Sequence, residues 1–319
     1  MDSSNQQKGP IYVCALGGES PLSQITRVRQ GLAQLPRVIL CDDITQADLV
    51  YANDAGCFDN VLQFKHSLKP TACIIFNVLD IPVHLIPPIG DYTFEKIAKL
   101  GTQLAQADKI TCISKFVQGQ IQQYLGLPSY VIYNPIKNVS PNKRLNGEKP
   151  YPYKVLMAGR LNDSNKRARS LSIPSLIMAG YEEKDVAVVG GEYPGWGTNL
   201  GVVSDETLND LYNSVDFVMA PSMLEGLGLV PLEGMICGAV PILCSDMTTI
   251  SEFPYPRFWW CHPSPQSISY HLRVRIENPH VMEADRDYCL SVGESLAEEL
   301  NSVAVARRIL NAYDNGNPF

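Results

Sequence analysis

The sequence predicts an α/β protein made of two doubly wound domains, each built on a parallel sheet. Short apolar runs of strand length alternate with helical patterns along most of the chain, which is typical of parallel sheets. The chain has 319 residues, long enough for two domains of ordinary size. A polar segment with several prolines and glycines, residues 138–153, separates the two halves and reads as an interdomain linker.

The first half contains a series of expected strands. Residues 11–16 form the first, and Gly17 and Gly18 end it ahead of a helix. The others are expected at residues 37–41, 48–52, 71–76, 109–113 and 129–133. Ser114 is a suitable N-cap for a helix over residues 115–125.

The second half repeats the alternation. Strands are expected at residues 154–158, 185–189, 215–219 and 240–244, with a weaker signal at 258–260. Ser204 is an N-cap with acidic residues in the turn that follows it. Further helices are expected at residues 232–237, 266–276 and 295–313, the last from its apolar spacing.

Composition excludes several classes of protein. The formal charge of -7 and the absence of a Lys/Arg-rich block argue against nucleic acid or an anionic membrane as the main partner. No apolar run approaches the ~20 residues of a membrane-spanning helix, and the polar start leads us to expect a cytoplasmic protein. Nine cysteines without a C-x-x-C pair fit reduced thiols better than disulfides or zinc ligands.

The stretch from Phe217 to Glu252 carries the strongest functional signal. A strand ends at Ala220-Pro221-Ser222, and a loop with two glycines leads to a helix that Pro231 is expected to open. The unpaired N–H groups of such a helix start can bind a phosphate. Glu225 and Glu233 lie on either side of this position, and carboxylates accept hydrogen bonds from vicinal sugar hydroxyls.

This stretch resembles the signature of the GT-B-fold, nucleotide-sugar-dependent glycosyltransferases of family 4 (glycosyl transferases group 1), which retain the anomeric configuration. Pro-Ser, Glu-Gly-x-Gly-Leu, a second glutamate and a final Val-Pro follow the family pattern, with Leu227 for Phe and Gly234 for Ala. The resemblance implies two Rossmann-like domains that face each other across a cleft. Residues 1–137 are then the acceptor-side domain, 138–153 the linker, 154–294 the nucleotide-sugar donor domain, and 295–319 a helix that crosses back to the N-terminal domain.

The resemblance also implies a set of site residues. Arg160, Lys166 and Glu225 correspond to catalytic positions, although Lys166 follows Arg160 at one residue more than the family spacing. The donor-binding positions are Gly17, Gly18, Gly159, Gly226, Leu227, Gly228, Leu229 and Glu233. Two alternative readings remain open: Gly17-Gly18 as a simple tight turn, and Lys166, Arg167 and Arg169 as a solvated basic turn.

The first domain departs from the family pattern at one position. Leu79 stands where many members have a histidine, before Asp80, and the nearest histidine is His84. Asp80 and His84 are therefore weaker candidates for contacts with the transferred sugar. A lone histidine is also commonly structural.

The implied function is transfer of a sugar from a UDP- or GDP-sugar to a hydroxyl of a glycan, lipid or protein, with no cofactor and no metal. Cationic side chains and the helix amino terminus would stabilise the leaving diphosphate. The alternative is a catalytically degenerate relative that binds a nucleotide sugar or glycan. A GT-B-fold sugar-nucleotide epimerase is a third class that the two-glutamate motif disfavours.

Overall fold

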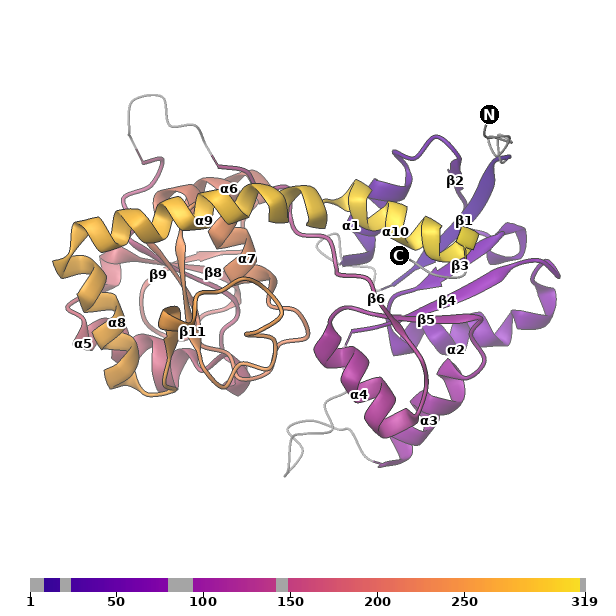
Figure 1. The fold of residues 1–319 in the computed structure, drawn as a ribbon, viewed down its shortest axis with the longest axis horizontal. Coiled ribbons are helices and arrows are strands. Elements are labelled where there is room, and N and C mark those ends of the chain that lie inside the picture. Colours follow the sequence, from indigo (N-terminus) through magenta and orange to yellow (C-terminus); the bar gives the residue numbers. More distant parts are fainter. Residues whose placement is uncertain (1–8, 18–23, 80–93, 142–148, 316–319) are drawn as a thin grey trace. The chain divides into compact units, whose positions relative to one another are not determined.

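The computed structural model describes residues 9–17, 24–79, 94–141 and 149–315. Its chain divides into two compact units (Figure 1). Unit 1 comprises Met1–Pro135 with Leu300–Phe319, and unit 2 comprises Ile136–Glu299. The units divide at residue 135, whereas the sequence-based domain boundary was placed at residue 137. Among the described residues, no helix combines the length and the apolar character needed to cross a membrane.

Unit 1 is built on a parallel sheet with strand order β2-β1-β3-β4-β5-β6. Its strands are β1 (Ile11–Leu16), β2 (Val38–Leu40), β3 (Leu49–Ala52), β4 (Cys73–Val78), β5 (Lys109–Cys112) and β6 (Tyr130–Val131). All six lie within two residues of the expected positions. The parallel register places the carboxyl ends of these strands at one edge of the sheet.

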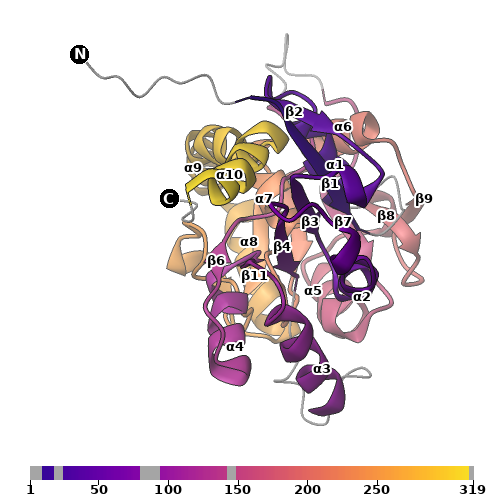
Figure 2. The same cartoon turned by 90° about the vertical axis from the view of Figure 1, so that its right-hand side faces the viewer.

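Helices cover this sheet (Figures 1 and 2). They are α1 (Gln24–Leu32), α2 (Ala55–Gln63), α3 (Phe94–Leu104), α4 (Lys115–Leu125) and α10 (Ser302–Asn315). The Ser114 cap is confirmed, because its side chain accepts a hydrogen bond from the Val117 N–H. Gly126 ends α4 in the left-handed conformation that glycine adopts without strain.

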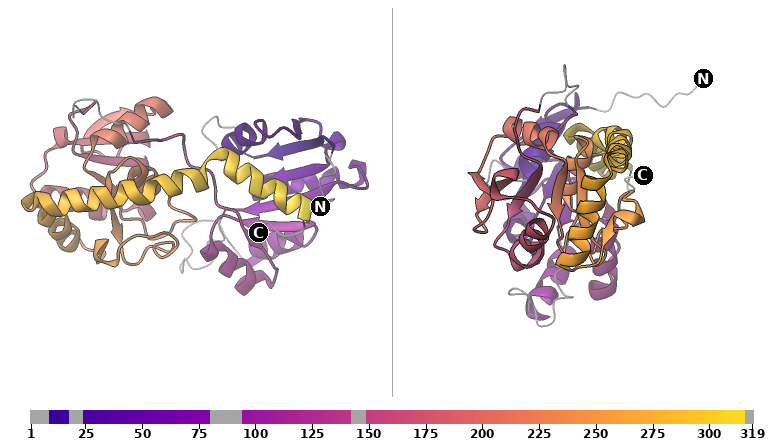
Figure 3. Two further views of the ribbon diagram at one scale, coloured as in Figure 1. Left: turned by 45° about the horizontal axis from the view of Figure 1, so that its top comes forward. Right: turned by 90° about the vertical axis from the view of Figure 1, so that its left-hand side faces the viewer.

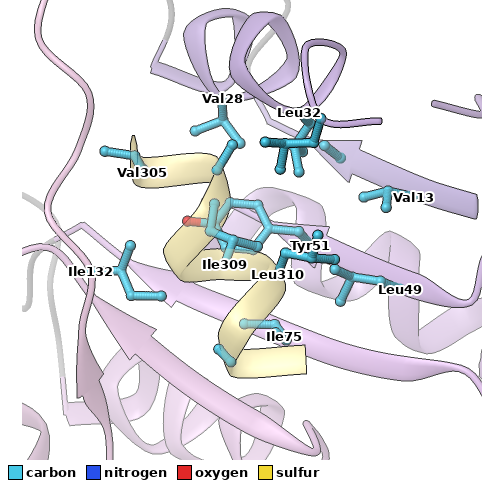
Figure 4. Packing of buried hydrophobic residues seen from close by; sticks show 14 of the residues in the cluster. Val13, Val28, Leu32, Leu49, Tyr51, Ile75, Ile132, Val305, Ile309 and Leu310 are labelled. Carbon is cyan, nitrogen blue, oxygen red and sulfur yellow. The ribbon is translucent and has the colours of Figure 1, made fainter. Parts of the chain in front are cut away.

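The last helix of the chain belongs to the core of unit 1. Val305, Ile309 and Leu310 of α10 pack with Val28 and Leu32 of α1 over the sheet (Figure 4). The approach of the two helices is close, since a Cβ on Gly31 would overlap the carbonyl group of Ser302. Unit 1 therefore needs a segment that lies some 170 residues further along the chain than its own last strand.

Unit 2 has a second parallel sheet with strand order β12-β11-β10-β7-β8-β9. Its strands are β7 (Val155–Arg160), β8 (Val186–Glu192), β9 (Thr198–Gly201), β10 (Phe217–Ala220), β11 (Val240–Cys244) and β12 (Trp260–Cys261). Its α-helices are α5 (Ile173–Met178), α6 (Asp205–Ser214), α7 (Leu229–Ile236), α8 (Pro265–Glu277) and α9 (Pro279–Leu300).

Two helix predictions need correction. Helix α7 begins at Leu229, two residues before Pro231, because Gly228 takes a φ of 81° and acts as its N-cap. The continuous helix expected over residues 295–313 is two helices, α9 and α10, which are separated at Asn301 (Figure 3). The apolar spacing runs through this break, so the pattern alone gave no sign of it.

The nine cysteines are all free thiols, as expected. Six are buried and three are partly buried. Burial raises the pKa of Cys244 and of Cys237 to about 12, so these thiols stay protonated and unreactive at neutral pH.

Candidate functional site

The carboxyl end of β7 forms one side of the candidate site. Gly159 takes a φ of 118° next to a shift in the pairing of β7 with β8. Its carbonyl lies so close to Gly190 that a Cβ on Gly190 would overlap it. Both positions therefore require glycine. Arg160, which ends the strand, is 78% exposed, and its guanidinium lies 3.8 Å from the Asp163 carboxylate.

A turn over residues 163–166, which we call the site turn, follows β7. The Asp163 side chain accepts a hydrogen bond from the Asn165 N–H at 2.9 Å and so caps a short 3-10 helix, Ser164–Lys166. The turn places Lys166 Nζ at 2.6 Å from Glu225 Oε1. The two side chains are 22% and 17% exposed, so this ion pair is sheltered but reachable. The structure thus brings together two of the three predicted catalytic residues from positions 59 apart in sequence.

The predicted glutamate lies in a short segment, Met223–Glu225, which we call the glutamate loop. Asn165 binds both backbone groups of Leu224: its Oδ1 accepts from the N–H at 2.7 Å, and its Nδ2 donates to the carbonyl at 2.7 Å. Thr248 Oγ1 does the same for Glu225, accepting from its N–H at 3.0 Å and donating to its carbonyl at 2.9 Å. The backbone around Glu225 is therefore held from both sides.

Arg167 also has a defined place in the site. Its guanidinium makes two hydrogen bonds to the Asp246 carboxylate, at 2.9 and 2.7 Å, and these raise its pKa above the usual value. Arg169 donates to the carbonyl of Pro194 and to Asn162. The reading as a solvated basic turn therefore fails for Lys166 and Arg167, which are sheltered in ion pairs, whereas Arg169 is exposed to solvent.

The glycine-rich loop ends at the amino terminus of α7. Gly228 caps this helix with a φ of 81°, and Leu227 is buried beside it. The Leu227 carbonyl accepts a hydrogen bond from Thr249 Oγ1 at 3.4 Å. Gly226, Leu227, Gly228 and Leu229 are consecutive in the chain. These predicted donor-binding residues therefore form one loop that leads directly into α7.

Glu233, predicted to bind the donor, is on α7 and is only 3% exposed. Its Oε1 accepts from the Lys137 N–H at 3.0 Å, and its Oε2 accepts from the Tyr212 hydroxyl at 2.9 Å. This carboxylate is thus anchored by protein donors, whereas Glu225 is paired with a lysine. Tyr212 was not predicted as a partner of Glu233, because it lies on another helix, α6.

Of the site residues predicted in unit 1, the structure describes Gly17 alone. Gly17 follows β1, and a Cβ on it would lie 2.6 Å from Ile25 Cβ, so packing against α1 requires glycine there. Gly18, Asp80 and His84 lie outside the described residues. Among the described residues of unit 1, Asn77 Nδ2 donates to Asn53 Oδ1 at 2.6 Å, and Thr111 Oγ1 donates to Asn77 Oδ1 at 2.8 Å. This buried polar row was not predicted.

The described residues contain no cluster of three or more His, Cys, Asp or Glu side chains that could hold a metal ion. The sequence Asp285-Arg286-Asp287 has the Asp-x-Asp form, but it lies within helix α9. Asp285 is buried there and accepts from Arg275 at 2.7 Å and from Trp259 at 3.0 Å. Metal independence of the reaction stays a prediction.

Comparison with known proteins finds similarity to glycosyltransferases. Residues 196–287 match the family model of glycosyl transferases group 1. The O-antigen chain mannosyltransferase B of Escherichia coli is 28% identical over 246 residues, which cover 72% of this chain and 60% of that protein. Granule-bound starch synthase 1 of Pisum sativum is 27% identical over 136 residues, 43% of this chain and 21% of that protein. The matched part of the chain thus spans less than two thirds of the length of either relative.

Solved structures extend the likeness to almost the whole chain. HepE of Anabaena, crystallised with UDP and glucose, has a TM-score of 0.72 at 13% identity and covers 95% of this chain and 99% of its own. Sucrose-phosphate synthase of Thermosynechococcus elongatus has a TM-score of 0.69 at 15% identity, covering 96% and 98%. The chain therefore has the two-domain, Rossmann-like GT-B fold of these proteins, and its residues 196–287 carry the sequence pattern of the glycosyl transferases group 1.

Proposed function

We propose that the chain is a glycosyltransferase that moves a sugar from a nucleoside-diphosphate sugar to a hydroxyl acceptor, with retention of the anomeric configuration. The observation that carries this proposal is the contact between Lys166 and Glu225 at 2.6 Å. It unites a cation and a carboxylate from two separate parts of the family pattern beside the amino terminus of α7. Complexes of HepE with UDP and with UDP-glucose support a UDP-sugar as the donor.

Each residue has a proposed role. Arg160 and Lys166 neutralise the diphosphate as negative charge develops on the leaving oxygen, and the amino terminus of α7 contributes its N–H groups. Glu225 accepts hydrogen bonds from hydroxyls of the transferred sugar. Lys166 then interacts with both the Glu225 carboxylate and the diphosphate. This role explains why the ion pair is partly exposed to solvent.

The nucleoside has a proposed partner as well. Glu233 binds the ribose hydroxyls, because it is the second glutamate of the family pattern and a carboxylate accepts hydrogen bonds from vicinal hydroxyls. The acceptor is a hydroxyl of a glycan, lipid or protein. The O-antigen chain mannosyltransferase favours a glycan acceptor, as its name indicates.

The test is incubation of the pure protein with a panel of UDP- and GDP-sugars, each with and without EDTA. We expect slow release of nucleoside diphosphate from one donor, at a rate that chelation does not change, because the cationic side chains act in place of a metal ion. Loss of turnover with EDTA and its recovery with Mg²⁺ or Mn²⁺ would contradict metal independence. Binding of a nucleotide sugar without any turnover would instead favour the catalytically degenerate alternative.

A further inference from the structure

The backbone of the glutamate loop is held by side chains where a neighbouring strand would ordinarily hold it. Both backbone groups of Leu224 bind the Asn165 amide, and both of Glu225 bind the Thr248 hydroxyl. We propose that Asn165 and Thr248 are positioning residues that fix Glu225 for the transfer reaction. This inference rests on the proposed function, and neither position is among the predicted site residues.

The arrangement continues a pattern of backbone pairing. One residue earlier, the Met223 N–H donates to the Asn165 carbonyl at 3.3 Å, and the Met223 carbonyl accepts from the Thr248 N–H at 3.0 Å. For Leu224 and Glu225, the described part of the chain has side-chain partners in place of such backbone pairs. An asparagine amide presents one donor and one acceptor side by side, as a peptide group does, and a threonine hydroxyl can donate and accept at once.

The site turn couples this support to the catalytic ion pair. Asn165 and Lys166 are adjacent in one capped turn. Asn165 binds the backbone of the glutamate loop, and Lys166 binds the carboxylate of Glu225. A shift of the Asn165 contact would therefore displace Lys166 and Glu225 relative to each other. Misplacement of reacting groups by about 1 Å can cost about a hundredfold in rate.

Substitutions at these positions separate the donor and acceptor roles. Asn165→Asp keeps the acceptor for the Leu224 N–H but places a carboxylate oxygen against the Leu224 carbonyl. Thr248→Val removes the hydroxyl at nearly constant volume, whereas Thr248→Ser retains it. Asn162→Asp, in the same loop, is the control for an added charge, since Asn162 does not contact the glutamate loop in any described interaction.

The first measurement is the rate of donor hydrolysis. We expect Asn165→Asp and Thr248→Val to lower kcat by about tenfold to a hundredfold, with Thr248→Ser and Asn162→Asp close to wild type. In a double-mutant cycle, Asn165→Ala should cost little further rate once Glu225→Gln is present, because its effect passes through Glu225. Additive losses in this cycle would overturn the inference, as would an unchanged rate in Asn165→Asp and Thr248→Val.

The second measurement does not depend on activity. Native-state hydrogen exchange should show protected amides at Leu224 and Glu225, with protection lost at Leu224 in Asn165→Ala and at Glu225 in Thr248→Val. Unchanged protection in both variants would overturn the proposed contacts. A wild type that turns over no nucleotide sugar would overturn the proposed function, whereas the exchange pattern would still test the positioning of this loop.

Discussion

Arg167 is the one described non-glycine residue with a positive φ, at 53°. This left-handed conformation costs a non-glycine residue about 1–2 kcal/mol. The two hydrogen bonds to Asp246 offset this cost. They connect Arg167, which follows the site turn, to the segment after β11. Arg167 is only 16% exposed, so solvent weakens this ion pair less than a surface pair.

A pair of substitutions separates the strain from the ion pair. Arg167→Ala loses the ion pair and keeps the strain, whereas Arg167→Gly loses the pair but also relieves the strain. We expect the glycine variant to be more stable than the alanine variant by about 1 kcal/mol in urea unfolding. An alanine variant of equal or greater stability would show that the backbone of Arg167 is not strained.

Glu233 supports two roles that can be measured separately. Glu233→Ala removes the acceptor that binds the Lys137 N–H and the Tyr212 hydroxyl, and we expect it to lower the free energy of unfolding by about 1–3 kcal/mol. Glu233→Gln keeps an acceptor oxygen for the Lys137 N–H, and its amide group can donate to the Tyr212 hydroxyl oxygen, so this variant should be nearly as stable as wild type. Calorimetry should nevertheless show weaker nucleoside diphosphate binding in the glutamine variant, by about 1.5–3 kcal/mol. Unchanged affinity would leave Glu233 with a structural role alone.

Among individual residues, those that occupy positions in the family's sequence motifs could be predicted from the sequence. Lys166 and Glu225 were found because each occupies a position in such a pattern, and the structure joins them. Asn165 and Thr248 could not be found in this way, because their partners are backbone groups of residues 59 and 23 positions distant. A side chain that recognises a peptide group leaves no complementary residue type in the sequence.

Among the elements, helices α1 and α10 approach each other closely at Gly31. Gly31→Ala would place a methyl group on the Ser302 carbonyl, so α10 must move away from α1. We expect a marked loss of thermal stability and faster proteolysis near residue 301, because α10 supplies part of the unit 1 core. Gly119→Ala is the matched control, since Gly119 lies in α4 with open space around its Cβ position.

The control should stabilise unit 1 slightly, by about 0.5–1 kcal/mol, as alanine favours a helix over glycine. Equal melting temperatures for Gly31→Ala and wild type would contradict the close approach of α1 and α10.

Helix α8 carries a pH-dependent contribution to stability. Burial and the neighbouring Arg275 charge lower the pKa of His271 below its ordinary value. As pH falls below about 6.5, the unfolded chain takes up a proton more readily than the folded one, so the free energy of unfolding decreases. We expect His271→Gln to remove part of this decrease between pH 7 and pH 5 in urea unfolding. An identical pH dependence in the variant would contradict the lowered pKa.

The elements were predicted well where a local signal exists. The strand over residues 11–16 and the helix over 115–125 agree with the structure at both ends, since glycines or a serine cap mark their limits. The start of α7 was placed two residues late, because proline at the third position of a helix is as acceptable as at the first. The break between α9 and α10 depends on packing within unit 1, which a local pattern does not contain.

At the scale of the whole molecule, alternation and length were sufficient to predict two parallel-sheet units. The described residues of the Lys166–Glu225 cluster all belong to unit 2, and the two units have separate sheets. The return of the last segment to unit 1 was expected only from the resemblance to the family. Burial of α10 depends on partners far away in sequence, so no local feature could have indicated it.

The central claim is that this molecule turns over a nucleotide sugar at the Lys166–Glu225 pair. The most direct measurement is the initial rate of donor hydrolysis by wild type, Lys166→Ala and Lys184→Ala. Lys184 is a matched control, because it pairs with Glu182 on the surface and is 77% exposed. We predict a rate about a hundredfold or more lower in Lys166→Ala and an unchanged rate in Lys184→Ala, as for the loss of one charge-stabilising donor. Wild-type turnover in a folded Lys166→Ala protein would contradict the account.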